Sequence, residues 1–166
     1  MIPFHPAPAP GTIGATSDDG GCVTTEGQTN ENRRVISEAF EVWRTGRSPV
    51  TQVFHHDMTW RVEGRSRAAG AYRDRQDFVD RVLTPFGARF PVDAPFGPTT
   101  IRGVVADDDQ VVVVWDGHGV ANYGVAYDNS HVWVTRVQDG QVVDGTAFFD
   151  SIAFDDLWTR VTPRSP

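Results

Sequence analysis

The sequence predicts an α+β domain in which helices cover one face of a strongly curved sheet. Apolar residues recur at helical spacing in the first half of the chain, interrupted by one short strand, whereas long alternating segments fill the region from residue 99 to 151. Turn signals at 107–110 and 138–141, the second with an Asp-Gly pair, indicate hairpins. Helices followed by a run of antiparallel strands are typical of α+β domains, and a curved sheet covered by helices leaves a cone open at one end.

The first half of the domain is expected to contain helices and one strand. Apolar residues between 35 and 43 form one stripe, with charged residues between them, so an amphipathic helix is expected there. Thr29 or Asn30 can cap its start, and Gly46 stands where it should end. The other elements expected here are a short helix over 48–54, a strand over 58–63 and a helix over 75–83.

The second half is predicted to form the sheet. Four prolines interrupt residues 84–98, after which the character becomes wholly β. Strands are expected over 99–105, 110–121, 125–138 and 141–151, followed by a helical turn over 154–161. We therefore predict one domain over residues 29–162, preceded by a flexible tail over residues 1–28, which are rich in Pro, Gly, Ser and Thr.

Composition and charge limit the possible partners. The chain has 166 residues, 39% hydrophobic and 22% charged, as expected for one globular domain. Its net charge of -7 would repel nucleic acid and anionic lipid surfaces. Cys22 is the only cysteine, so no disulfide forms within the chain. Without an apolar run of membrane-spanning length or a secretory signal pattern, a cytoplasmic location is the default expectation.

The segment Tyr127 to Val134 carries an unusual set of side chains on one face. Successive residues of a strand point to opposite faces, so Tyr127, Asn129, His131 and Trp133 share one face. Large rings mixed with a few hydrogen-bonding groups are typical of a small-molecule pocket. The alternative is that His131 is a core histidine that forms a hydrogen bond with a neighbouring residue.

The order of several motifs resembles that of a known superfamily. The relevant residues are Asp57 and Trp60 near the first strand, Gly70, Tyr72, Asp74 and Arg75 at the turn into a helix, and Tyr127, Asn129, Asp139, Gly140 and Asp150 in the last strands. Over residues 30 to 160 this pattern resembles the nuclear transport factor 2-like superfamily, and within it the SnoaL-like and ketosteroid isomerase-like proteins. The resemblance implies a cone-shaped, cystatin-like barrel with a mixed or antiparallel sheet, a pocket between sheet and helices, and a homodimer through the outer sheet face.

The resemblance also suggests which strand positions line the pocket. By comparison with limonene epoxide hydrolase-like relatives, these are Trp60 and Val62, Asp116 and His118, Asn129 and His131, and Ala147 and Phe149. Trp115 is then expected on the face opposite Asp116, where a dimer interface can use it. Val114 and Ala147 stand where the epoxide hydrolases carry Arg and Asp, and Val62 stands where ketosteroid isomerases carry their base. Neither of those two mechanisms is therefore expected.

A different acid–base set remains available on these positions. We predict Asp116, His118, His131 and Asn129 as catalytic residues, because a carboxylate beside an imidazole raises its basicity and an amide can donate to a developing oxyanion. The predicted substrate-binding residues are Trp60, Val62, Trp133, Tyr127 and Phe149. The predicted function is cofactor-independent isomerase, cyclase or dehydratase chemistry on a small hydrophobic, cyclic or polyketide-like molecule. The alternative is a ligand-binding or dimerisation module without catalysis.

Several residues carry a second interpretation. His118 lies between Gly117 and Gly119, which can instead mark a bulge or tight sheet curvature. Three neighbours, His55, His56 and Asp57, offer metal-binding side chains, but adjacent residues rarely converge on one ion, so no metal is expected and Asp57 is interpreted as a cap or turn residue. No phosphate-binding loop or Gly-x-Ser-x-Gly motif is present, and no cofactor is predicted.

Overall fold

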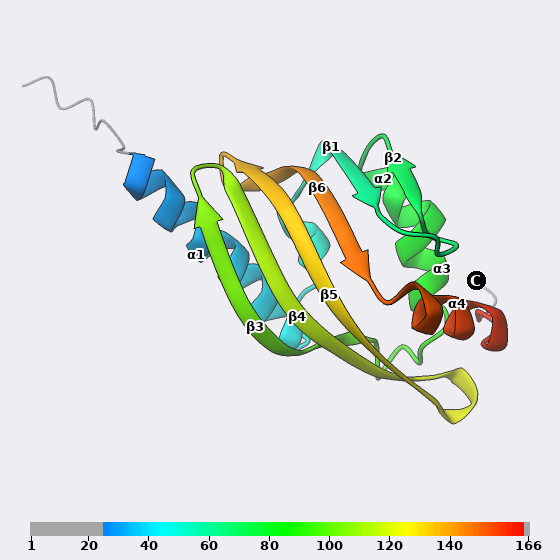
Figure 1. Ribbon diagram of the computed structural model, residues 1–166. Coiled ribbons are helices and arrows are strands. Elements are labelled where there is room, and N and C mark those ends of the chain that lie inside the picture. The colour runs from blue at the N-terminus through cyan, green and yellow to red at the C-terminus, as the bar shows by residue number, and fades with distance from the viewer. Residues whose placement is uncertain (1–24, 165–166) are drawn as a thin grey trace, which may run out of the picture.

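The computed structural model describes residues 25–164 as a six-stranded sheet with helices packed against it (Figure 1). Three short turns of other helix types also occur: 3-10 helices at Val50–Val53 and Asn122–Gly124, and a π-helical turn at Val79–Leu83. The helices and strands are α1 Thr25–Arg44, β1 Phe54–Val62, β2 Gly70–Tyr72, α2 Arg75–Phe78, α3 Thr84–Gly87, β3 Gly97–Asp107, β4 Gln110–Ala121, β5 Val125–Gln138, β6 Gln141–Phe149 and α4 Ser151–Arg160.

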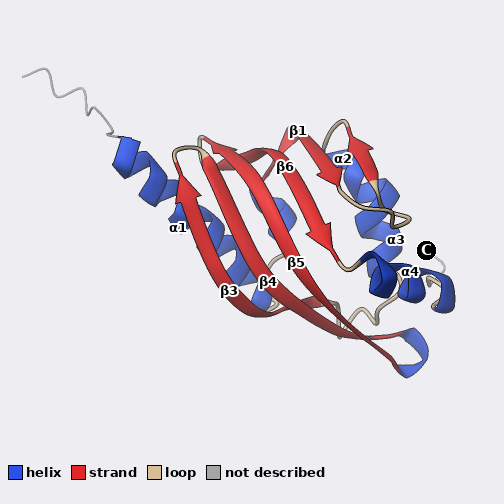
Figure 2. Ribbon diagram, in the orientation of Figure 1, coloured by secondary structure: helices blue, strands red, loops and turns tan. Residues whose placement is uncertain are grey.

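The sheet is mixed and open. Its strand order is β2-β1-β6-β5-β4-β3, with β1 parallel to β6 and every other pair antiparallel. The predicted α+β class is confirmed, but the edge strands β2 and β3 do not pair, so the cone is a curved sheet rather than a closed barrel. Figure 2 shows the long strands bending together, with α1 behind β3 and β4. Register shifts between β3 and β4 contribute to this bend, because a bulge bends the strand that carries it.

The strand boundaries follow from local turn chemistry. Asp139 and Gly140 both have positive φ, 50° and 73°, as a two-residue hairpin turn between β5 and β6 requires. Asp108 has φ 52° at the turn between β3 and β4. The predicted bounds of β4 and β5 are both confirmed.

The first helix starts earlier than its sequence signals suggest. α1 begins at Thr25, so Thr29 lies inside the helix rather than at its cap. The Thr29 hydroxyl donates to the Thr25 carbonyl and accepts the Asp108 N–H at 3.1 Å, while Asn32 donates to the Asp108 carbonyl at 3.0 Å. These polar residues therefore attach the helix to the β3–β4 turn. Most of the predicted tail, residues 1–24, lies outside the described residues.

The core is a cluster of aromatic rings between α1, α2 and the inner face of the sheet. Phe40 of α1 meets Trp115 and Trp133 edge-on at 5.7 and 5.2 Å between ring centroids. Trp60 of β1 lies over Gly145 of β6 so closely that a Cβ at this glycine would be 2.1 Å from the indole ring. Glycine at position 145 is therefore what allows the Trp60 indole to pack closely on the neighbouring strand.

Two elements had no sequence signal. β2 is only three residues long and lies in a segment of small residues, and α3 lies in the proline-interrupted stretch. Proline at the second position of α3 is compatible with a helix because the first helical N–H groups have no partner within the helix. Within residues 25–164, no helix combines the length and apolar character that crossing a bilayer would require.

Candidate functional site

A cavity of about 380 Å³ lies between the inner face of the sheet and the helices. The sheet contributes Val62 from β1, Trp115 from β4, Phe149 from β6 and three residues of β5: Tyr127, His131 and Trp133. The opposite wall comes from the π-helical turn and its neighbours, including Val79, Val82, Leu83 and Phe86. The cavity thus joins segments that are far apart in the sequence.

The lining of the cavity is almost entirely apolar. Among the described residues that line it, none is Asp, Glu, Lys or Arg. The lining residues with polar side-chain groups are Thr51, Thr84 and Tyr127, which carry hydroxyls, His131 with its imidazole, and Trp43, Trp115 and Trp133 with their indole N–H groups. Such a surface can accommodate an uncharged molecule, whereas a charged one would lose its hydration without gaining a partner.

His131 is the most distinctive group in this wall. Its ring stacks on Trp115 with 4.0 Å between centroids and 7° between planes, and the residue is only 8% exposed. Burial lowers the pKa of His131 to about 3, against a smaller opposing effect of Asp116. The imidazole is therefore neutral at physiological pH, with one N–H donor and one acceptor nitrogen. Its Nε2 has no hydrogen-bond partner anywhere in residues 25–164.

Asn129 shares a strand face with His131 but is occupied by structural hydrogen bonds. Its amide nitrogen donates to the Tyr127 hydroxyl at 2.7 Å and to the Asp150 carbonyl at 3.0 Å, and its oxygen accepts the Asp150 N–H at 2.9 Å. Asp150 in turn caps α4 by accepting the N–H groups of Ile152 and Ala153. Asn129 therefore fixes the junction between β6 and α4, and it is not among the residues that line the cavity.

Tyr127 presents its ring to the cavity while its hydroxyl is held by Asn129. Burial, as the largest cause, raises the pKa of Tyr127 to about 12. The phenol is therefore un-ionised over the physiological range.

The expectation that Asp116 and His118 face the cavity is wrong. Asp116 lies on the outer face, where Arg102 binds both carboxylate oxygens at 2.8 and 2.6 Å and the Ser130 hydroxyl donates at 2.7 Å. These hydrogen bonds, led by that of Arg102, hold the pKa of Asp116 below its usual range. His118 is also on the outer face and contacts Asp128, with 2.7 Å between Nδ1 and Oδ1.

The reason for this reversal is the regular register of β4 with β5. Trp115 lies directly opposite His131, and directly paired residues point to the same face, so Asp116 must point the other way. Gly117 takes the next inward position, where a Cβ would be 2.2 Å from the Phe96 ring. Trp115 does lie opposite Asp116, as expected, but it faces the cavity rather than a dimer interface.

The predicted binding residues divide into two groups. Val62, Trp133, Tyr127 and Phe149 line the cavity, as does Ala147. Trp60 is on the same face but is 1% exposed and packs beneath the wall against Trp133 and Phe78. The sequence reasoning missed Trp43, Phe86 and Phe96. Their only sequence signal is that large aromatic residues occur in α1 and in the segment 84–98, which four prolines interrupt.

No protein-family model and no curated protein matches the sequence. Solved structures do match its fold. Bal32a, from a soil-derived mobile gene cassette, aligns with a TM-score of 0.63 and 22% identity over 79% of this chain and 98% of that chain. A nuclear transport factor 2-like protein from Burkholderia xenovorans LB400 aligns with a TM-score of 0.55 and 18% identity over 81% and 97% of the two chains.

A third structure, from Jannaschia sp. CCS1, is described as a SnoaL-like polyketide cyclase. It aligns with a TM-score of 0.59 and 18% identity over 80% of this chain and 94% of that chain. Identities this low establish a common fold and leave function to the site itself. The chain therefore has the nuclear transport factor 2-like fold, as the resemblance in its sequence predicts.

Proposed function

We propose that this protein binds a small, uncharged, ring-containing molecule in the cavity, and that His131 makes the hydrogen bond that orients it. The observation that carries the proposal is a buried, neutral imidazole in a mostly apolar wall, whose Nε2 has no hydrogen-bond partner within residues 25–164; the indole Nε1 of Trp115, on which His131 stacks, likewise has none there. Ligand sites typically measure about 300–1,000 Å³ and combine apolar walls with a few placed polar groups. An unpaired polar atom in such a wall costs about 1–3 kcal/mol, which a ligand hydrogen bond would relieve.

Catalysis at His131 is the second candidate. The acid–base set expected from the sequence is reduced to this residue, because Asp116 and His118 lie on the outer face and Asn129 is occupied. A histidine with a pKa of about 3 is a weak base at neutral pH, but a neutral imidazole can still donate to a developing oxyanion. A protein of this fold is described as a SnoaL-like polyketide cyclase, so isomerase, cyclase or dehydratase chemistry is the class to test.

The first experiment is a thermal-shift screen of the full chain against steroids, polycyclic aromatics, terpenoid ketones and epoxides. A ligand at a hundredfold excess over its Kd should stabilise the folded state by about 2.7 kcal/mol. His131→Phe should weaken binding about tenfold, because it keeps the ring stack and removes one hydrogen bond. Mass spectrometry of each incubated hit then separates the two candidates: a ligand altered by the parent and not by His131→Phe indicates catalysis, and an unaltered ligand indicates binding alone.

A matched pair of variants shows whether the ligand occupies this cavity. Ala147→Leu adds bulk inside the cavity, whereas Thr146→Leu adds the same side chain to the neighbouring position on the outer face. Binding should disappear in the first variant and persist in the second. Equal affinity in both variants, or stronger binding of charged than of uncharged analogues, would contradict the proposal.

We also propose that two copies pair through the outer face of the sheet. Val112, Val114, Val132 and Val134 are only half-buried there, and Phe148 is 44% exposed, so this face presents apolar area for which the described helices provide no cover. Light scattering after size exclusion should give about twice 18.3 kDa. Phe148→Glu should give the single-chain mass and Ile152→Glu should not, although Ile152 is the more exposed residue. A single-chain mass for the parent would contradict the pairing.

A further inference from the structure

An irregular part of β1 places three potential metal ligands on one side of the strand. β1 pairs with Val142 at Phe54 and with Asp144 at Thr59, so five steps along β1 correspond to two along β6. Phe54 and Met58 are fully buried, whereas the three residues between them are half-buried or exposed. Consecutive residues of a regular strand alternate between faces, so this bulge is what brings three neighbours to the outer side.

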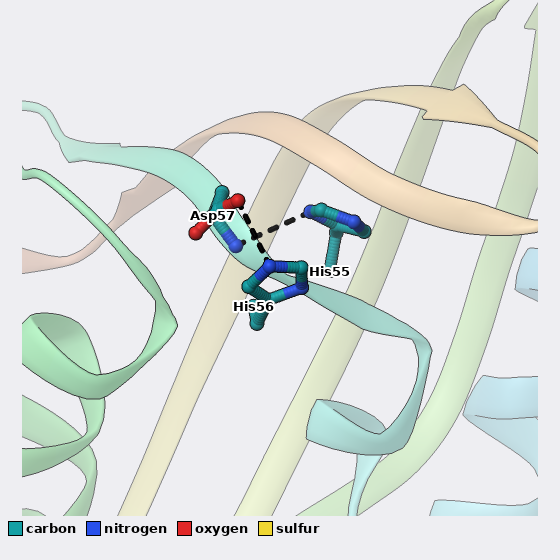
Figure 3. A group of neighbouring side chains, drawn as sticks. All are labelled: His55, His56 and Asp57. Carbon is teal, nitrogen blue, oxygen red and sulfur yellow. Dashed lines mark hydrogen bonds and ion pairs between the residues drawn. The ribbon is translucent and has the colours of Figure 1, made fainter.

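The three side chains are His55, His56 and Asp57, and their donor atoms converge (Figure 3). One nitrogen or oxygen from each lies within 4.8 Å of those of the other two. His56 Nε2 is 2.9 Å from Asp57 Oδ2, and the Asp57 N–H donates to His55 Nδ1 at 3.2 Å. The expectation that these neighbours do not converge is wrong because of the bulge, and Asp57 is a strand residue rather than a cap.

We propose that His55, His56 and Asp57 bind one divalent transition-metal ion of the class that prefers imidazole nitrogen, Zn²⁺, Ni²⁺ or Cu²⁺. Bonds of about 2.0–2.1 Å place the ligands of one ion at most about 4.2 Å apart, and the donor atoms here already lie within 4.8 Å of one another, so small side-chain rotations are sufficient. Two imidazoles with one carboxylate form a donor set suited to these ions rather than to Mg²⁺ or Ca²⁺, which favour oxygen ligands.

Binding would replace a direct contact between two of the ligands with metal bonds. His56 Nε2 and Asp57 Oδ2 lie 2.9 Å apart, so both atoms are within reach of one ion. A metal ion binds a ring nitrogen that carries no proton, so Nε2 is the unprotonated nitrogen of His56 when the ion is bound. The side chains of His56 and Asp57 are 68% and 74% exposed, so the ion reaches them directly from water. Three protein ligands also leave a coordination position for water or another small ligand.

This site is separate from the cavity, and the inference goes beyond the proposed function. The pair His118 and Asp128 provides an internal comparison, because it offers one imidazole and one carboxylate at 2.7 Å on the same chain. Two ligands bind an ion more weakly than three. If metal binds at residues 55–57 and not at His118, the binding depends on the third ligand, because both places have an exposed His–Asp pair.

The test is isothermal titration of the full chain with Zn²⁺ and Ni²⁺ after removal of bound metal by a chelator. We expect one ion per chain. The double variant His55→Asn/His56→Asn should weaken binding at least about a hundredfold, since loss of outer-shell partners alone costs roughly 10- to 100-fold. His118→Asn should leave the affinity unchanged. Binding of equal affinity in the double variant, or no saturable binding to the parent, overturns the proposal.

A second measurement identifies the ligands independently of affinity. Electron paramagnetic resonance of the Cu²⁺-loaded chain should show coupling to two imidazole nitrogens, and the signal should fall to one nitrogen in His56→Asn. The altered side chains are at the surface, so circular dichroism should show the parental fold in each variant. A Cu²⁺ spectrum that is unchanged in His56→Asn overturns the proposal, because His5, Cys22 and the other histidines are retained in that variant.

Discussion

Replacing Arg89 with methionine should lower the free energy of unfolding by about 3 kcal/mol. The substitution removes two charge-assisted hydrogen bonds, each of which contributes about 1.5–3 kcal/mol. Part of this loss is offset because the folded protein no longer has to bury a charged guanidinium. The guanidinium of Arg89 is buried, with the residue 5% exposed, and burial lowers its pKa. It donates to the carbonyl of Pro85 at 2.6 Å and to that of Trp158 at 3.0 Å, and lies 3.9 Å above the Trp158 ring. Methionine would leave both carbonyls without this donor.

Urea unfolding followed by tryptophan fluorescence measures this change. Arg160→Met is the matched control, because Arg160 is also in the C-terminal part of the chain but pairs with Asp156 on the surface, where its side chain is 63% exposed. That substitution should change the unfolding free energy by less than about 0.5 kcal/mol. If both substitutions change the unfolding free energy equally, the hydrogen bond from Arg89 to Trp158 of α4 does not stabilise the domain.

Acidification from pH 7 to pH 4.5 should remove about 3 kcal/mol of stability through His131 alone, at roughly 1.4 kcal/mol for each pH unit below 6.5. Burial lowers the pKa of His131 from 6.5 to about 3 in the folded protein. Between these two values the unfolded chain binds a proton at this residue and the folded protein does not, so stability falls as pH falls. This loss spans the window from pH 6.5 down to about 3.

Urea unfolding of the parent and of His131→Phe at pH 7, 5.5 and 4.5 isolates this contribution. Phenylalanine cannot take up a proton and can keep the stack on Trp115. The free energy of unfolding of the variant should therefore fall by about 3 kcal/mol less than that of the parent between pH 7 and pH 4.5. Phe149→Leu is the control, because it alters a ring next to His131 without removing a titratable group. The same pH dependence in the parent and in His131→Phe would mean that His131 is not buried as a neutral group.

The features of the fold that the sequence predicts are those determined by residues close together in the chain. β4 and β5 have the predicted bounds because their alternation is long and their ends are marked by a turn or by a change of pattern. Positive φ at Asp139 and Gly140 is likewise a local property of an Asp-Gly pair. α1 extends beyond its predicted start because polar residues of its first turns contact the β3–β4 turn, a contact between residues more than 70 positions apart.

The candidate site was predicted only in part because the inner face of a strand depends on its partner. The face of β5 was recognised from its own residues, and Tyr127, His131 and Trp133 do line the cavity. The face of β4 was inferred from resemblance, and pairing of Trp115 with His131 reverses it. A shift of one residue moves every side chain of a strand to the other face. The signal available in the sequence was the pair of glycines at 117 and 119, which leave room for Phe96 and Phe90.

The sequence by itself therefore determined the α+β class, the order of its elements apart from β2 and α3, the hairpin turns and the mixed polar and aromatic face of β5, because each follows from residues close together in the chain. Only the tertiary structure decided that Asp116 and His118 face outward and that Asn129 is committed to Asp150. It also decided that Nε2 of His131, beside the apolar cavity, has no partner among the residues it describes. It also decided that His55, His56 and Asp57 converge. These outcomes depend on strand register and on contacts across the fold, where one bulge or one paired residue fixes the direction of every side chain.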